Sequence, residues 1–258
     1  MKKTLVIVAL IAWGFAFASC QNRAPTAPGQ TSELQPVVPS NFARVSDENF
    51  LYVSRHLVTQ GEWIAVMGAN SGDRFRPDPG MPPETDRMSL PAEMVSWYDA
   101  LVFANMLSMA TAGLTLAYEL PDVWPNPASW SSDPADWGDA PASPSRCDRW
   151  DAARIVAGSN GYRLPTDAQW ESAARAGGFA LSESDATENA GTQEAGRQRP
   201  SLLYDNVGEW VWDWYGADGR VVRTWDRFAT DAEAQIARRG RLHPSARGLN
   251  LGFRLVRP

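Results

Sequence analysis

Three stretches in which apolar residues recur at helical spacing are each preceded by a short polar motif. Each motif has Ser or Thr first and Glu, Asp or Gln three residues later: Thr59-Gln-Gly-Glu62, Ser96-Trp-Tyr-Asp99 and Thr166-Asp-Ala-Gln169. In such a capping box the two side chains accept hydrogen bonds from backbone N–H groups that a helix start leaves exposed. The pattern therefore predicts three short helices, the second running to about Met109 and the third stopping at Gly177-Gly178.

Strand-like alternation is concentrated later in the chain. A first strand is expected at Tyr52–Val58, and Trp210-Val-Trp-Asp-Trp214 alternates so that its three indoles share one face. Arg220–Arg223 and Gly252–Val256 are expected to be the last strands. Because helices come early, strands cluster late and no βαβ alternation or internal repeat is visible, the predicted fold class is α+β.

A Pro-rich stretch separates the second and third predicted helices. Pro121–Ser145 contains six prolines and three tryptophans. Proline interrupts both helices and central strands, so we expect this stretch to be a long surface excursion within one domain.

The N-terminus has the organisation of an export signal. A basic start, Met1-Lys2-Lys3, is followed by the apolar run Leu5–Phe17, which is too short to span a bilayer. The run ends at Phe17-Ala-Ser-Cys20, which resembles the bacterial lipobox, in which the cysteine is lipidated and becomes the first mature residue. An ordinary secretory signal is the alternative, and both place the protein outside the cytoplasm.

These features divide the chain into three parts. Residues 1–20 are expected to be the lipoprotein signal, residues 21–41 a flexible Pro-rich tether, and residues 42–258 a single domain. We expect the mature protein to be exported and held by a lipid on Cys20 in the cell envelope, on the outer surface or the periplasmic face. The membrane is then the first predicted partner.

Composition narrows the possible chemistry. A net charge of -6 without a basic cluster argues against nucleic acid as a partner. Only two cysteines exist, Cys20 and Cys147, and since a lipid on Cys20 would consume its thiol, we expect no disulfide within the chain. The two histidines, His56 and His243, are far apart in sequence, so no local zinc site or catalytic triad is indicated.

Six blocks between Val58 and the C-terminus resemble, in order, the formylglycine-generating enzyme, or sulfatase-modifying factor, family. The blocks begin at Val58, Val95, Gly161, Asn206, Arg220 and Gly252, and the third reads Gly161-Tyr-Arg-Leu-Pro-Thr-Asp-Ala-Gln-Trp-Glu171. The resemblance implies a C-type-lectin-like fold.

Within these blocks, several residues are expected to hold the fold together. Arg163 and Arg254 lie in apolar strand contexts, where a buried guanidinium needs several acceptors and would tie elements together. Trp170, Trp210 and Trp212 are expected to be core residues.

The resemblance also implies a calcium site. Family members bind structural calcium partly through an Asn-Val-Trp-Glu-Trp block, and the corresponding candidates here are Asn206, Val207 and Glu209. Gly208 replaces the Trp of that block. A simple hydrogen-bonded turn is the alternative interpretation of the block.

The enzymatic chemistry of the family is not matched by this sequence. In the family, two cysteine thiolates in the C-terminal segment hold copper, the soft-ligand arrangement that copper(I) requires. Here no cysteine follows Cys147, and Ala237 stands about where the second one belongs. Iron-dependent relatives use a histidine triad on a separate helical domain, which the chain lacks. We therefore recognise no catalytic residue and no copper or iron site.

Three functions remain. The first is a surface-anchored scaffold that binds a protein or small ligand through C-terminal aromatic and basic residues: Trp225, Arg227, Phe228, Arg238, Arg239, Arg241 and His243. This interpretation rests on Thr224–Asn250, the stretch that departs most from the family pattern. The alternatives are an oxidase acting on sulfatase-type cysteine by another route, and a structural envelope protein.

Overall fold

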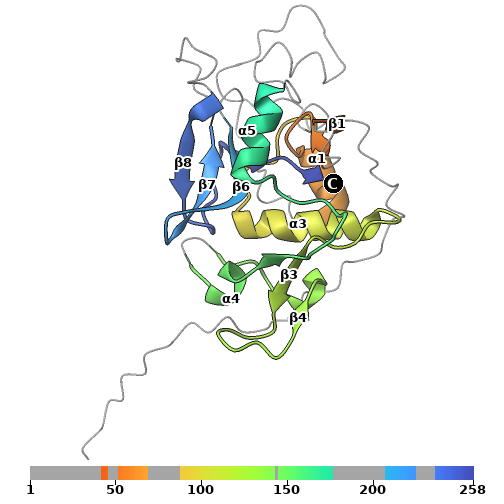
Figure 1. Ribbon diagram of the computed structural model, residues 1–258, viewed down its shortest axis with the longest axis vertical. Helices are drawn as coiled ribbons and strands as arrows, with labels where there is room; N and C mark the ends of the chain where they lie inside the picture. Colours follow the sequence, from red (N-terminus) through yellow and green to blue (C-terminus); the bar gives the residue numbers. More distant parts are fainter. Residues whose placement is uncertain (1–41, 46–51, 69–87, 143–144, 177–206, 225–235) are drawn as a thin grey trace, which may run out of the picture.

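The computed structural model describes residues 42–45, 52–68, 88–142, 145–176, 207–224 and 236–258 (Figure 1). The predicted signal, Cys20 and the tether lie outside these residues, as do Gly177-Gly178. No helix among the described residues is both long and apolar enough to cross a membrane.

All three helices predicted from capping boxes are confirmed. They are α1 (Gln60–Met67), α3 (Trp97–Ala110) and α5 (Asp167–Arg175), and in each the N-cap side chain and the third helical residue satisfy each other's backbone N–H group. The fold also contains a single turn of helix, α4 (Asp148–Asp151), and a 3-10 turn, η2 (Pro134–Asp136).

The strands form three small sheets. One has the order β1-β2-β10 and a second β4-β3-β5, both antiparallel; the largest has the order β8-β7-β6-β9, in which β6 and β9 run parallel. The strand bounds are β1 Phe42–Arg44, β2 Tyr52–Ser54, β3 Tyr118–Pro121, β4 Trp130–Ser131, β5 Arg154–Ile155, β6 Gly208–Tyr215, β7 Gly219–Arg223, β8 Arg239–Leu242, β9 Leu251–Phe253 and β10 Val256–Arg257. The α+β class is confirmed.

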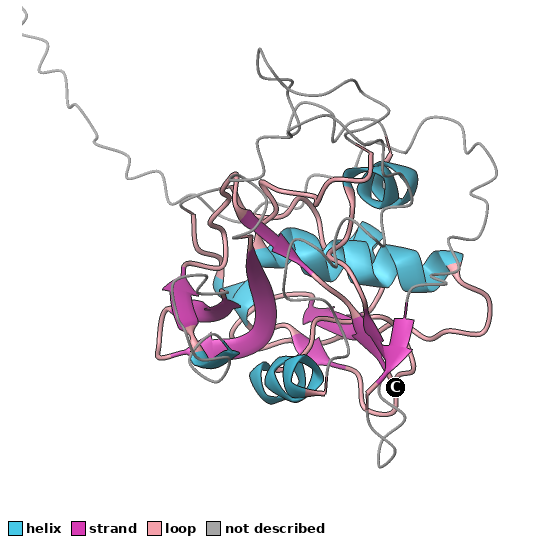
Figure 2. Cartoon of the chain, turned by 90° about the horizontal axis from the view of Figure 1, so that it is seen from above, coloured by secondary structure: helices cyan, strands magenta, loops and turns pink. Residues whose placement is uncertain are grey.

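The strand β6 separates two hydrophobic clusters. Trp210 and Trp212 face the larger cluster, which contains the buried side of α3, whereas Val211 faces a smaller cluster with Trp170 of α5. From above, α3 lies crosswise to α1 and α5, with strands between α3 and α5 (Figure 2). The alternation predicted for 210–214 thus places α3 and α5 on opposite faces of β6. Trp214, the third indole of the alternating stretch, is 38% exposed.

Two strand predictions need correction. The strand expected at Tyr52–Val58 is β2, which follows β1 and stops at Ser54. The expected closing strand Gly252–Val256 is two strands in different sheets, β9 and β10. The chain changes sheet at Arg254. The Arg254 guanidinium pairs with Glu209 of β6, and the next residue, Leu255, donates its backbone N–H to Ser54 Oγ of β2.

The Pro-rich stretch is not only a surface excursion. Trp124 is 47% exposed at the tip between β3 and β4, but Trp137 is 1% exposed and packs edge-on against Trp150 in the main core. Its indole N–H donates to Ser131 O at 2.8 Å. The stretch therefore returns to the core after η2, which proline content alone does not predict.

The structure differs from the expectation at Cys147, which is buried and disulfide-bonded. The other cysteine of the sequence, Cys20, lies outside the described residues. A sulfur atom in a thioether to a lipid cannot also form a disulfide, so lipidation of Cys20 and a disulfide at Cys20 exclude each other.

Candidate functional site

A buried ion pair joins the N-terminal part of β6 to the C-terminal strands. Glu209 accepts from Arg254 Nε at 2.5 Å and from Arg254 Nη2 at 2.7 Å, and Trp170 Nε1 donates to the same carboxylate at 2.8 Å. Arg254 Nη1 also donates to Ser54 O at 2.9 Å. These contacts hold β6, α5, β2 and the C-terminus in one arrangement.

The same geometry bears on the calcium candidates. Both Glu209 oxygens already accept hydrogen bonds from Arg254, and Val207 is buried, while Asn206 lies outside the described residues. Within the described part of the chain, no three His, Cys, Asp or Glu side chains are grouped so that they could hold a metal. Calcium binding through Asn206 therefore stays a prediction.

The other residues expected to be structural lie as follows. Arg163 is partly buried, and its Nη1 donates to Gln169 Oε1 at 2.7 Å and to Leu164 O at 3.1 Å. Trp210 is fully buried and donates to Val95 O at 2.8 Å. Trp212 is partly buried and stacks on Tyr118.

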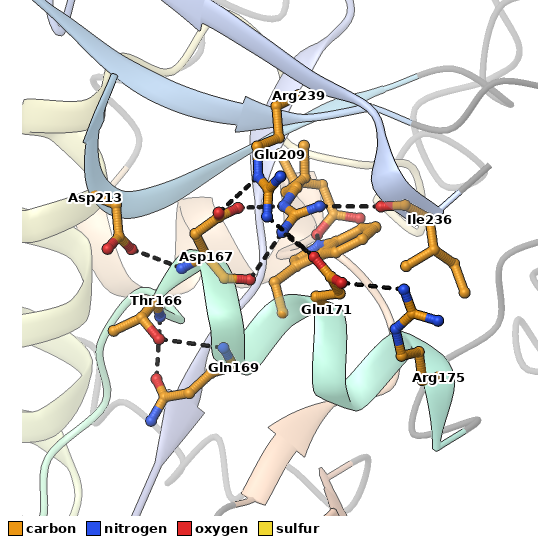
Figure 3. Close-up of polar contacts among 11 residues, drawn as sticks. Thr166, Asp167, Gln169, Glu171, Arg175, Glu209, Asp213, Ile236 and Arg239 are labelled. Atoms are coloured by element: carbon orange, nitrogen blue, oxygen red, sulfur yellow. Dashed lines mark hydrogen bonds and ion pairs between the residues drawn. The ribbon is translucent and has the colours of Figure 1, made fainter. Parts of the chain in front are cut away.

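Carboxylates of α5 neutralise two arginines of the largest sheet (Figure 3). Arg223 on β7 is fully buried and pairs with Asp167 and with Glu171, the latter at 2.8 Å. Arg239 on β8 pairs with the same two carboxylates at 2.7 and 3.1 Å. The nearby guanidinium of Arg223, followed by that of Arg175, lowers the pKa of Glu171. This network fixes β8 against α5.

The C-terminal residues predicted to bind a ligand are not one uniform surface. Arg238, Arg239 and Arg241 are all exposed, and Arg241 pairs with Asp218 at 2.9 Å. Arg239 faces the α5 carboxylates, and His243 Nδ1 lies 2.8 Å from Ser245 Oγ. Trp225, Arg227 and Phe228 lie outside the described residues. Of the described members of the predicted set, Arg238 lines a pocket.

This pocket, with a volume of about 340 Å³, lies between the ends of β7 and β8 and the loop that leads into β9. We call it the C-terminal pocket. Its described lining residues are Gly208, Val222, Thr224, Arg238, Leu242, Ala246, Arg247, Gly248, Asn250 and Leu251. Most of them come from Thr224–Asn250, the stretch that departs from the family pattern.

One wall of the C-terminal pocket is held by the start of α3. Arg247 Nε and Nη2 both lie 2.9 Å from Asp99 Oδ2. That oxygen also accepts from the backbone N–H and the hydroxyl of Ser96, at 2.9 and 2.6 Å. The capping box of α3 therefore orients Arg247 through Asp99, and the Arg247 side chain is only 15% exposed.

Gly208 allows close packing in another wall. A Cβ atom at Gly208 would lie 2.8 Å from Val222 Cγ1, 3.5 Å from Thr224 Cγ2 and 3.5 Å from Asn250 O. All three of these residues line the pocket. Glycine at position 208 therefore lets Val222 pack against the backbone of β6, and a larger residue there would displace Val222.

Sequence reasoning missed several lining residues, above all Arg247 and Asn250. Both lie in the stretch already singled out, but Arg247 was not distinguished from its neighbours because its partner, Asp99, is 148 positions away. The replacement of the family's Trp by Gly208 was a signal that the packing differs at this point of the chain.

A second unusual group lies on the same face of β7 as Val222, toward the larger hydrophobic cluster. Arg220 of β7 is 1% exposed, and its guanidinium carbon lies 3.6 Å from the ring centres of both Trp97 and Trp214. Its Nη1 donates to Trp212 O at 2.7 Å, whereas Nε and Nη2 have no acceptor among the described residues. Burial lowers the pKa of Arg220 to about 9, so the group remains charged at neutral pH.

This chain is similar in sequence to a known family of domains and to a curated protein. Residues 35–258 match the family model described as the sulfatase-modifying factor enzyme 1-like domain. A curated protein from Paenibacillus barcinonensis, named chaperone protein LppX, is 27% identical over 305 aligned residues that cover 100% of this chain and 99% of the relative.

Two solved structures are also similar to this chain. Treponema denticola variable protein 1 is similar with a TM-score of 0.52 and 29% identity, covering 81% of this chain and 84% of that one. CarF is similar with a TM-score of 0.47 and 24% identity, covering 81% and 86%. Since the family model spans all the described elements, from β1 to β10, the chain belongs to the sulfatase-modifying factor enzyme 1-like domain family.

Proposed function

We propose that this protein is an envelope-anchored binding protein whose C-terminal pocket receives a ligand or a segment of a partner protein. The observation that carries the proposal is the pocket itself. Its lining mixes aliphatic side chains with polar ones, among them two arginines, on a sheet fixed by buried ion pairs. Ligand sites likewise combine apolar surface with a few positioned polar groups.

The sequence weakens the oxidase alternative. A copper oxidase of this family needs two thiolates in the C-terminal segment, and the chain has no cysteine after Cys147. The structural-protein alternative is weakened by the pocket, because a purely structural role requires no hollow lined by arginines.

The names of the relatives agree with a binding role. The Paenibacillus relative is named a chaperone protein, and the Treponema denticola relative is named a variable protein. In our proposal the shared frame carries a binding surface whose specificity belongs to the C-terminal segment.

The proposal can be tested by screening the full-length protein against a chemically diverse ligand and peptide library by thermal shift. Saturation at a hundredfold excess over Kd stabilises a protein by about 2.7 kcal/mol, which is readily detected. We expect binders whose effect is lost in Ala246→Leu, which adds bulk in the pocket, but kept in Leu249→Trp. Leu249 is 70% exposed and does not line the pocket, so it is the matched control.

A second assay tests the alternative directly. Copper and a sulfatase-type cysteine peptide are added to the purified protein, and oxygen uptake and peptide mass are followed. We expect no oxidation. Stoichiometric copper together with conversion of the peptide cysteine to an aldehyde would replace the binding proposal with the oxidase alternative.

A further inference from the structure

The described lining of the C-terminal pocket is divided into an apolar part and a cationic part. Val222, Leu242, Ala246 and Leu251 supply aliphatic surface, whereas Arg238 and Arg247 supply positive charge. No carboxylate belongs to the described lining, although the whole chain carries a net charge of -6. A ligand that matches both parts has an apolar body and an anionic or strongly accepting group.

Arg247 is already oriented before a ligand arrives. Its Nε and Nη2 contact Asp99, and its Nη1 lies 3.3 Å from Pro141 O. A guanidinium has five N–H donors, so these contacts leave donors for a further acceptor. Because the side chain is held, binding costs little of the rotamer entropy that a free arginine would lose.

The size of the pocket limits the apolar body. Its volume of about 340 Å³ lies at the small end of the range of about 300–1,000 Å³ for ligand sites. One residue-sized group therefore fills it.

The arginines favour an aromatic body over an aliphatic one. A guanidinium is attracted to the face of an aromatic ring, and this chain uses the contact repeatedly: Arg154 lies 3.6 Å from the Trp130 ring centre, and Arg220 lies as close to Trp97. An aromatic ring between the aliphatic wall and the arginines would gain apolar burial and cation–π attraction together.

We propose that the C-terminal pocket binds an aromatic group that carries a carboxylate, with the ring against Val222, Leu242 and Leu251 and the carboxylate on Arg247 and Arg238. This inference rests on the proposed binding function and specifies its ligand. The same chemistry is present in the C-terminal aromatic residue of a polypeptide and in a free aromatic acid.

The test measures binding of matched probes to the full-length protein by calorimetry. The probes are N-acetyl-tryptophan, its carboxamide, N-acetyl-alanine, and a pentapeptide ending in Trp with a free carboxylate. We expect N-acetyl-tryptophan to bind at least about tenfold more tightly than either its carboxamide or N-acetyl-alanine, because a charge-assisted hydrogen bond and the ring contact are lost in turn. Tighter binding of the pentapeptide identifies a polypeptide end as the source, and weaker binding identifies a free acid.

Variants locate the binding. Gly208→Trp would displace Val222 from the pocket wall, and Ala246→Leu reduces the pocket from the loop that carries Arg247. Both are expected to weaken N-acetyl-tryptophan binding by roughly tenfold or more, a loss of about 1.4 kcal/mol. Leu249→Trp is the control and should bind as the wild type does. Because position 208 is tightly surrounded, melting curves establish that Gly208→Trp is folded, and Ala246→Leu provides the answer if it is not.

Three outcomes would overturn the inference. They are equal binding of the acid and the carboxamide, unchanged binding in Ala246→Leu, and no binding of any aromatic acid. If library ligands still bind in a way that Ala246→Leu abolishes, the proposed function stands and only the ligand class is wrong. If no ligand of any class responds to the pocket variants, both proposals fail.

Discussion

Two arginines on the strand β7 show how differently the same buried residue can be accommodated. Arg223 is surrounded by acceptors, namely the carboxylates of Asp167 and Glu171 and the carbonyl of Ile236 at 2.9 Å. Arg220, three positions earlier, lies between indole rings and has one carbonyl acceptor among the described residues. The side chains differ only in surroundings, so a matched pair of substitutions isolates the effect of those surroundings.

We predict that Arg220→Met and Arg223→Met differ sharply in stability. Arg223→Met removes two ion pairs and the hydrogen bond to Ile236 O, while Asp167 and Glu171 keep Arg239 as a partner, and should lower the free energy of unfolding by about 3 kcal/mol. For Arg220, cation–π contacts of about 2 kcal/mol each are offset by a desolvation cost of several kcal/mol. Arg220→Met should therefore stay within about 1 kcal/mol of wild type.

Urea unfolding of both variants provides the measurement. Equal destabilisation of the two would contradict the prediction, and it would mean that the two indoles stabilise Arg220 as strongly as carboxylates stabilise Arg223.

Glu93 is a buried carboxyl group beside a strained residue. It is 8% exposed, and burial raises its pKa to about 7. The next residue, Met94, has φ of 57°, in the left-handed region that non-glycine residues rarely adopt, and its N–H donates to Gly248 O at 2.9 Å beside the C-terminal pocket.

The raised pKa predicts a pH-dependent stability with a definite sign. Between the ordinary value of 4.5 and about 7, the folded state binds the proton more tightly than the unfolded state, so stability falls as pH rises through this window. Glu93→Gln should remove this dependence. We expect the variant to melt a few degrees above wild type well above the raised pKa, but not below the ordinary value, where both forms are uncharged. A stability difference that does not change with pH would exclude this role of Glu93.

At the scale of elements, helices could be predicted from the sequence where a short segment satisfies the hydrogen-bonding groups of its own backbone. The three capping boxes start helices because Ser or Thr and its partner lie within one turn, which the sequence makes visible. Structural features that depend on residues far apart in the sequence were not predictable. The split into β9 and β10 depends on the pairing of Arg254 with Glu209, 45 residues away, and the burial of Trp137 depends on Trp150.

The candidate site has the same limitation. The segment 224–250 was found by its departure from the family pattern, whereas the residues that shape the pocket were not. The position of Arg247 depends on Asp99 in another element. The close packing at Gly208 depends on neighbours from β7 and from the loop before β9.

The capping box of α3 also positions Arg247 of the C-terminal pocket. Ser96 is fully buried and holds Asp99, which holds Arg247, whereas Thr59 caps α1 by its exchange with Glu62. Loss of a cap costs about 0.5–2 kcal/mol. We expect Thr59→Ala to lower stability by about 1 kcal/mol without changing binding in the C-terminal pocket.

Ser96→Ala should be worse in both respects. It removes the cap and a buried hydrogen bond, so a loss of about 2–3 kcal/mol is expected, together with weaker binding of the pocket ligand. Chemical denaturation and calorimetry on the two variants make the comparison. If Ser96→Ala loses stability but binds normally, Arg247 does not need the α3 cap for its position.

At the scale of the whole molecule, the predicted lipid anchor determines where the pocket acts. We predict that Cys20→Ser moves the protein from the membrane fraction to the soluble fraction of the envelope. Mass spectrometry of the peptide that contains Cys20 should give the mass of a lipid-modified residue in the wild type. Because a lipid and a disulfide cannot share one sulfur, the same spectrum decides between them. Retention of Cys20→Ser in the membrane would contradict lipid anchoring.

The position of the last two strands determines when the molecule can become complete. The strand β9 pairs with β6, and β10 pairs with β2 and bridges Arg163, so the final residues join three regions made long before them. A growing chain that ends before Leu251 has a Glu209 without its arginine partner in its future core. The chain therefore cannot close its native fold before Val256 and Arg257 have been translated, and up to that point it is in a state that can still be threaded through a membrane.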